Sequence, residues 1–210
     1  MGDLGELRHE LKPPIIPPMT LRIHADGIEF ETWNKKTTAL RYDAITNVAR
    51  QNLSEEMGGA SGGGLVGGLV TSGWKNSIFS FAGPGGLIVL EGRFAGGHPK
   101  EIETCVNTAL PLAVAKAKAT LAGGGAFTFS KGSLTATTLS TEVPKFIGTK
   151  TVSIALDDVD FLANGAVVKK GAKKSFLGLP KTEFTVIAAK HDLVLQSLLQ
   201  ERGKLRLKTA

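Results

Sequence analysis

Residues 40–48 read LRYDAITNV, and a closely similar pattern returns at residues 154–162 as IALDDVDFL. In each copy apolar side chains alternate with others, then an Asp appears, and a β-branched residue comes two positions later. Alternation with a period of two predicts a strand, and an Asp can end that strand by bonding its own backbone. The sequence therefore predicts two similar halves, each with a strand, a turn and a second strand. The matched pairs are Leu40 and Ile154, Tyr42 and Leu156, Asp43 and Asp157, and Ile45 and Val159.

A second similarity lies upstream of each copy. Residues 24–27, HADG, open a predicted hairpin in the first half, and residues 129–132, FSKG, open one in the second. The stretch between this turn and the following Asp is longer in the second half, which predicts an insertion there.

Further turn and helix signals complete the pattern. Asp26-Gly27 and Asn164-Gly165 stand near alternating runs, which indicates β-hairpins. A helix is predicted over residues 98–121, where apolar residues recur every four positions and Cys105 lies beside them as a small core residue. Asp192 can cap a final helix. The apolar positions of the two helices are Ile102, Val106, Leu110 and Val114 in the first, and Leu195, Leu198 and Leu199 in the second.

These elements divide the 210 residues into an arm and two halves. Residues 1–19 contain KPPIIPP, which favours a polyproline II segment, and they predict a structured N-terminal arm. Residues 20–122 form the first predicted half and residues 123–210 the second. Each half reads as several antiparallel strands followed by one helix, so the predicted fold class is mainly β with capping helices.

Composition and charge narrow the class of protein. Hydrophobic residues make up 42% of the chain, which is enough for packed cores. The net charge of +6 comes from residues 123–210, because acidic and basic residues balance in residues 1–122. This asymmetry fits either solubility alone or an anionic partner for the second half. The lone Cys105, with no signal peptide and no long apolar run, predicts a cytoplasmic protein that could contact a membrane peripherally.

A Gly-rich stretch interrupts the first half. Residues 57–73 read MGGASGGGLVGGLVTSG and carry no charge. A loop between strands is one interpretation, and a contact for another subunit or a membrane surface is the other. The second interpretation rests on two apolar pairs that a pure spacer would not need. The candidate partner-contact residues are Leu65, Val66, Leu69 and Val70.

A basic hairpin is the clearest candidate for binding anions. Residues 169–174 read KKGAKK, and four ammonium groups in so short a stretch could meet phosphates or acidic lipid headgroups. Nucleic acid is not expected, because stacking aromatic residues do not interleave with these lysines. The candidate anion-contact residues are Lys169, Lys170, Lys173 and Lys174.

No catalytic constellation is found in the sequence. The four histidines are scattered, and none pairs with a Cys or another His at metal-ligand spacing. Asp157, Asp158 and Asp160 form the one carboxylate cluster, with no Glu at the spacing that a calcium loop needs. No nucleophile elbow or phosphate loop is present. We therefore expect a protein that is not an enzyme and that needs no metal or cofactor.

The order of elements resembles an uncharacterised bacterial family built as two fused pleckstrin-homology-like (PH-like) halves. The resemblance covers roughly residues 21–202 and rests on the turn–Gly, the strand ending in Asp, the Asn-Gly hairpin and the Leu-rich final helix. It implies two split barrels, each of antiparallel strands plus a C-terminal helix. This chain departs from such families by having Tyr42 and Leu156 where Trp is frequent. The usual lipid site around the first hairpin does not carry over, because that hairpin offers Asp26 in one half and only Lys131 in the other.

The function predicted from these observations is a non-catalytic PH-like module that binds protein partners or self-associates. The alternative is a peripheral membrane module that binds anionic lipid headgroups through the basic hairpin.

Overall fold

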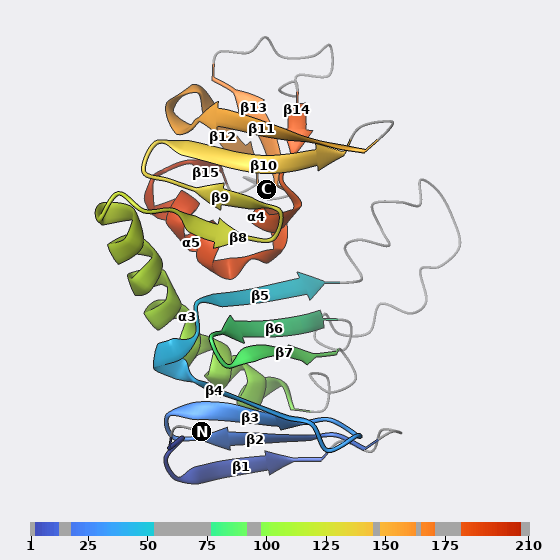
Figure 1. The fold of residues 1–210 in the computed structure, drawn as a ribbon. Helices are drawn as coiled ribbons and strands as arrows, with labels where there is room; N and C mark the ends of the chain where they lie inside the picture. The colour runs from blue at the N-terminus through green and yellow to red at the C-terminus, as the bar shows by residue number, and fades with distance from the viewer. Residues whose placement is uncertain are drawn as a thin grey trace. The chain divides into compact units, whose positions relative to one another are not determined.

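The structure is a computed structural model that describes residues 3–12, 18–52, 77–91, 98–144, 148–162, 165–170 and 182–206. The chain forms two compact units, Met1–Ala113 and Val114–Ala210. Each unit consists mainly of antiparallel strands accompanied by helices (Figure 1). The predicted fold class, mainly β with capping helices, is confirmed.

The first unit begins with a four-stranded antiparallel sheet in the order β1-β2-β3-β4. Apolar residues of β2 and β3 point inward, while Arg22 and Glu29 between them are only half-buried. The sequence places residues 7–11 in an N-terminal arm, yet they form β1 and pair with β2. Alternation could not reveal this strand, because its first four residues are all exposed. The four strands are Leu7–Leu11, Thr20–His24, Gly27–Glu31 and Thr37–Arg41.

A short 3-10 helix, η1 (Tyr42–Ala44), leads from this sheet into a second, three-stranded one. Tyr42 is buried and Asp43 is exposed, and the N–H of Tyr42 donates to the carbonyl oxygen of Asp26 at 2.8 Å. The second sheet has the order β5-β6-β7, and Val48, Phe79, Phe81, Ile88 and Leu90 supply its buried face. Its strands are Asn47–Asn52, Ser77–Gly83 and Gly86–Leu90.

The second unit repeats this order of elements. Four strands form the sheet β11-β10-β9-β8, the 3-10 helix η2 (Leu156–Asp158) follows, and β12, β13 and β14 form the next sheet. A short C-terminal strand, β15 (Leu205–Arg206), pairs in parallel with β12. The other strands are β8 Phe127–Phe129, β9 Gly132–Leu134, β10 Thr138–Pro144, β11 Thr149–Ala155, β12 Val159–Leu162, β13 Ala166–Lys169 and β14 Thr182–Thr185.

The two 3-10 helices lie at the predicted sequence repeat. The N–H of Leu156 donates to the carbonyl oxygen of Thr137 at 2.8 Å, just as the N–H of Tyr42 donates to Asp26. The turn at Asp26 therefore corresponds to the β9–β10 turn, which contains Thr137. The predicted match between HADG and FSKG is wrong, because FSKG forms the β8–β9 turn, one hairpin earlier in its sheet. That offset, rather than an insertion alone, accounts for much of the longer spacing in the second half.

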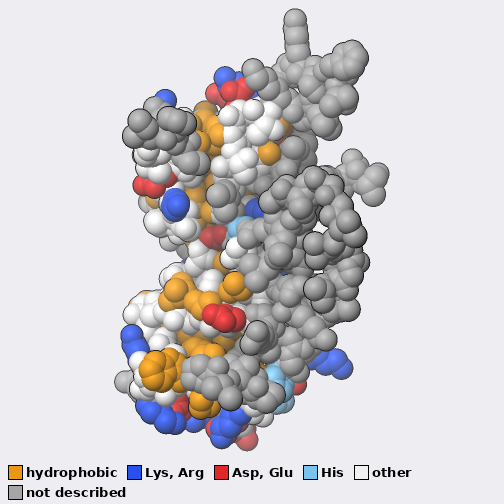
Figure 2. All heavy atoms as spheres, turned by 90° about the vertical axis from the view of Figure 1, so that its right-hand side faces the viewer, with side chains coloured by type: hydrophobic (Ala, Val, Ile, Leu, Met, Phe, Trp, Pro, Cys, Tyr) orange, Lys and Arg blue, Asp and Glu red, His pale blue; other side chains and the backbone are white. Residues whose placement is uncertain are grey.

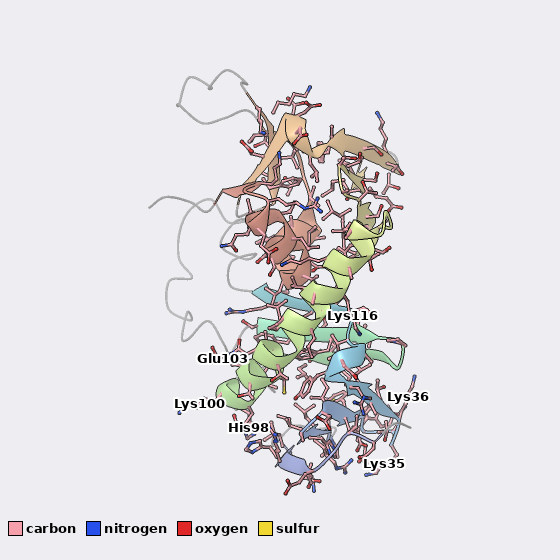
Figure 3. All side chains as sticks on the ribbon, turned by 90° about the vertical axis from the view of Figure 1, so that its left-hand side faces the viewer. Lys35, Lys36, His98, Lys100, Glu103 and Lys116 are labelled. Atoms are coloured by element: carbon pink, nitrogen blue, oxygen red, sulfur yellow. The ribbon has the colours of Figure 1, made fainter. Side chains whose placement is uncertain are left out.

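Helix α3 (Pro99–Ala122) buries a stripe of mostly small residues. The predicted stripe is confirmed at Ile102, Val106 and Val114, whereas Leu110 is only half-buried. Figure 3 marks exposed residues along this helix, namely Lys100, Glu103 and Lys116. The residues at the centre of the buried stripe are Ile102, Cys105, Ala109 and Ala113.

Two C-terminal helices, α4 (Ile187–His191) and α5 (Leu193–Glu201), follow the last sheet. The Asp192 carboxylate accepts a hydrogen bond from the N–H of Leu195 at 2.9 Å, which confirms the predicted cap. Leu195, Leu198 and Leu199 are buried, as predicted.

Within the described ranges, no helix has both the length and the apolar character that crossing a lipid bilayer requires.

Replacing Gly27 by Ala should destabilise the first unit. A Cβ at this position would overlap the carbonyl oxygen of Leu40 and lie 2.7 Å from Cδ2 of Leu4, so the strands must shift. We expect a loss of about 1–3 kcal/mol in the free energy of unfolding, measured by urea denaturation of the whole chain. Gly123→Ala is the matched control, because its Cβ would meet nothing closer than 3.5 Å. A Gly27→Ala protein with the wild-type urea midpoint would contradict the predicted close approach.

Candidate functional site

The candidate contact residues fall into two groups in the structure. Lys169 ends β13 and Lys170 follows it, and both are exposed. The other candidates lie outside the described residues, so the predicted contact through the Gly-rich stretch stays a prediction. Those residues are Leu65, Val66, Leu69, Val70, Lys173 and Lys174.

The described end of the basic hairpin lies beside carboxylates. The N–H of Lys170 donates to the carbonyl oxygen of Asp158 at 2.9 Å, which places it next to the exposed Asp157 and Asp158 of η2. Nζ of Lys204 is 3.2 Å from Oδ1 of Asp157. Opposite charges this close partly cancel each other for an approaching ligand. The local positive charge around Lys170 is therefore smaller than the sequence pattern indicates.

A second charged cluster covers the outer face of the first sheet. The Arg22 guanidinium is 2.5 Å from Glu29, 3.0 Å from Glu10 and 3.0 Å from Glu31. Its hydrogen bonds, the one to Glu29 above all, raise the pKa of Arg22 further above its ordinary value. Lys35 and Arg22 together lower the pKa of the Glu31 carboxyl. Three carboxylates thus surround one guanidinium, which makes this cluster a sheet-stabilising network and a poor anion site.

Tyr42 and Cys105 meet in the core of the first unit. The Tyr42 hydroxyl donates to Sγ of Cys105 at 3.5 Å, and both side chains are buried. Burial, with the neighbouring thiol, raises the pKa of the Tyr42 hydroxyl above its ordinary value. Burial likewise raises the pKa of the Cys105 thiol to about 11. The placement confirms Cys105 as a small core residue and leaves it without the exposed thiolate that a nucleophile needs.

Cys105 should resist alkylation in the folded protein. At pH 8.5 a thiol with a pKa of about 11 is ionised far less than one with an ordinary value. We expect iodoacetamide to modify native Cys105 roughly a hundredfold more slowly than the urea-unfolded chain. Mass spectrometry of timed samples measures both rates, and equal rates would show that the thiol is accessible in the native state.

Large apolar side chains are exposed at several places on the first unit. Two of them, Leu87 and Val89, lie on the solvent side of β7 and are 58% and 39% exposed. We call them the β7 outer face. Strand β7 ends the sheet β5-β6-β7, and its inward residues Ile88 and Leu90 are buried, so the exposed pair results from strand alternation. Trp33, in the β3–β4 turn, is 62% exposed. Figure 2 shows hydrophobic side chains in orange at the surface among polar and charged ones.

No metal site emerges among the described residues, where no group of three or more His, Cys, Asp or Glu side chains converges. The carboxylates of the one acidic cluster separate in the fold, because Asp158 lies in η2 and is exposed whereas Asp160 lies in β12 and is buried.

The second unit contains a pocket of about 250 Å³. The last turns of α3 form one wall, the end of α5 forms another, and the β9–β10 turn closes the side between them. Lys118 and Glu201 form an ion pair of 2.6 Å at this pocket. Nothing in the sequence pattern indicates it, because its walls are far apart along the chain. The lining residues are Lys118, Leu121, Ala122, Ala136, Leu198, Glu201 and Arg202.

No protein-family model and no curated protein matches the sequence of this chain.

Proposed function

We propose that this chain is a non-catalytic interaction module of two PH-like halves that binds a protein partner or a second copy of itself through the β7 outer face. The observation that carries the proposal is the exposure of Leu87 and Val89 on a strand at the end of its sheet. Solvent-facing positions of such a sheet are normally polar. Apolar side chains at the edge of a sheet are typical of surfaces where another chain docks.

The order of elements supports the PH-like part of the proposal. In each unit four meandering strands lead through a 3-10 helix into three more strands and then into a helix. A PH-like half is expected to have this plan of two bent sheets and a C-terminal helix. The repeated plan supports an origin by duplication, since both the joints and their hydrogen bonds recur.

The charges favour a protein partner over an anionic membrane. Lys170 lies beside Asp158, whose carboxylate partly offsets the charge of the described part of the basic hairpin, while Lys204 pairs with the neighbouring Asp157. The β7 outer face carries no lysine or arginine of its own. Full burial of an exposed aliphatic side chain contributes roughly 1.5–3 kcal/mol, and Leu87 and Val89, which are 58% and 39% exposed, would gain a corresponding part of it.

Changing Leu87 and Val89 together to Lys should weaken association at least tenfold. Both positions are exposed, so the fold tolerates the change, while an interface would have to bury two unpaired charges. Sedimentation velocity over a concentration series measures self-association, and capture from a cell extract measures partner binding. Thr149→Lys with Thr151→Lys is the matched control, because it adds the same charge at exposed positions of β11. Identical behaviour of the two double variants in both assays would refute the proposed surface.

Flotation with anionic liposomes separates the proposal from the membrane alternative. We expect the protein to remain in the bottom fraction when the vesicles contain phosphatidylserine at physiological salt. Co-flotation that disappears in high salt and in a Lys169→Glu, Lys170→Glu variant would instead favour lipid binding through the basic hairpin.

A further inference from the structure

The pocket of the second unit is lined by both apolar and charged side chains. Its lining includes the buried Leu121 and Leu198, and Ala122 and Ala136 contribute small side chains. Its volume of about 250 Å³ is below the range of roughly 300–1,000 Å³ that is typical of drug-sized ligands. A ligand of this pocket must therefore be small and partly apolar.

Arg202 supplies hydrogen-bond donors to the lining of the pocket. Its Nη1 group donates to the carbonyl oxygens of Thr135 at 3.3 Å and Ala136 at 2.9 Å, which orients the guanidinium toward the β9–β10 turn. A guanidinium has five N–H donors in a planar fork. Because both of these bonds use Nη1, the Nε and Nη2 hydrogens have no acceptor among the described residues. A guanidinium that is fixed by two hydrogen bonds and still has N–H donors available is suited to a planar anion such as a carboxylate.

We propose that this pocket binds a small carboxylate that carries a short, branched apolar group. The apolar group rests against Leu121 and Leu198, and the carboxylate accepts hydrogen bonds from Arg202 with Lys118 close by. This inference goes beyond the proposed function and does not rest on it, because the β7 outer face belongs to the other unit.

Two features of the pocket limit the affinity. Glu201 already pairs with Lys118 at 2.6 Å and repels a second carboxylate. Helices α3 and α5 both end at the pocket, so their carbonyl ends add partial negative charge. We therefore expect a dissociation constant on the order of 1 mM for a ligand of this size.

The test uses the full ¹⁵N-labelled chain and 4-methylpentanoate as the probe. We expect saturable shifts of the backbone amide signals of Leu121, Ala136 and Leu198 in NMR spectra. The neutral analogue 4-methylpentanamide has the same apolar group and should bind at least fivefold more weakly. No saturable shift up to tens of millimolar, or equal binding of acid and amide, overturns the proposal.

Two variants should change the affinity for 4-methylpentanoate in opposite directions, and a third should block the pocket. Glu201→Gln removes the competing carboxylate and should tighten binding about threefold, whereas Arg202→Gln should weaken it at least fivefold. Ala122→Leu fills the pocket from an exposed position and should abolish the shifts without unfolding the chain, which keeps the test valid if Arg202→Gln is unstable. Glu142→Gln removes an exposed carboxylate that does not line the pocket and is the matched control. Unchanged binding in Ala122→Leu would show that the ligand sits elsewhere.

A carboxylate close to a branched apolar group is found both in free branched acids and at the C-terminus of a peptide that ends in leucine. The tripeptide Gly-Gly-Leu and its C-terminal amide separate these sources. Binding of the free-acid tripeptide at least as tightly as 4-methylpentanoate, and loss of it in the amide, indicates a chain terminus. Weaker binding of the tripeptide than of 4-methylpentanoate indicates a small free acid.

Discussion

In each unit, one backbone hydrogen bond fixes the point where the chain passes from the first sheet into the second. The N–H of Tyr42 donates to Asp26, and the N–H of Leu156 donates to Thr137, both at 2.8 Å. Each bond ties the start of a 3-10 helix to the hairpin beside it, while the side chain of the same residue enters the core. A buried side chain and a satisfied backbone donor at one residue leave little freedom for the chain.

Close approach of backbones is the second condition on which this plan depends. Gly27 lies so near the carbonyl of Leu40 that a Cβ would collide with it, and Gly132 stands in the same relation to Ser140. In α3 the most buried positions include Cys105, Ala109 and Ala113, whose short side chains let the helix lie close to its neighbours. Such positions tolerate little added volume, because protein interiors are as densely packed as organic crystals.

Two kinds of group stand out on the described surface: charges that lie beside opposite charges, and apolar side chains that remain exposed. Arg22 lies within hydrogen-bond distance of carboxylates, and so does Lys204, which pairs with Asp157, so these charges largely offset each other. Leu87 and Val89 are apolar, and part of each side chain is exposed to water. Covering them would release that water, which is the main driving force of protein association. The two proposals therefore concern the β7 outer face and the pocket of the second unit, where the Arg202 guanidinium still has N–H donors available.

Local patterns were enough to predict most hairpins, the Asp192 cap, the buried positions of α5 and the presence of two similar halves, because side-chain periodicity and turn chemistry depend only on neighbours along the chain. They missed β1, whose exposed residues do not alternate, and they aligned FSKG with the wrong hairpin, because strand pairing involves residues far apart in sequence. The same limit applies to the sites. The pattern does not show that Lys170 of the basic hairpin lies beside Asp158. Nor does it show that Arg202, at the end of a helix, reaches the β9–β10 turn. The chain's own pattern selects its strands and helices, but the environment of a charge or an apolar side chain comes from distant segments, and only packing brings those segments together.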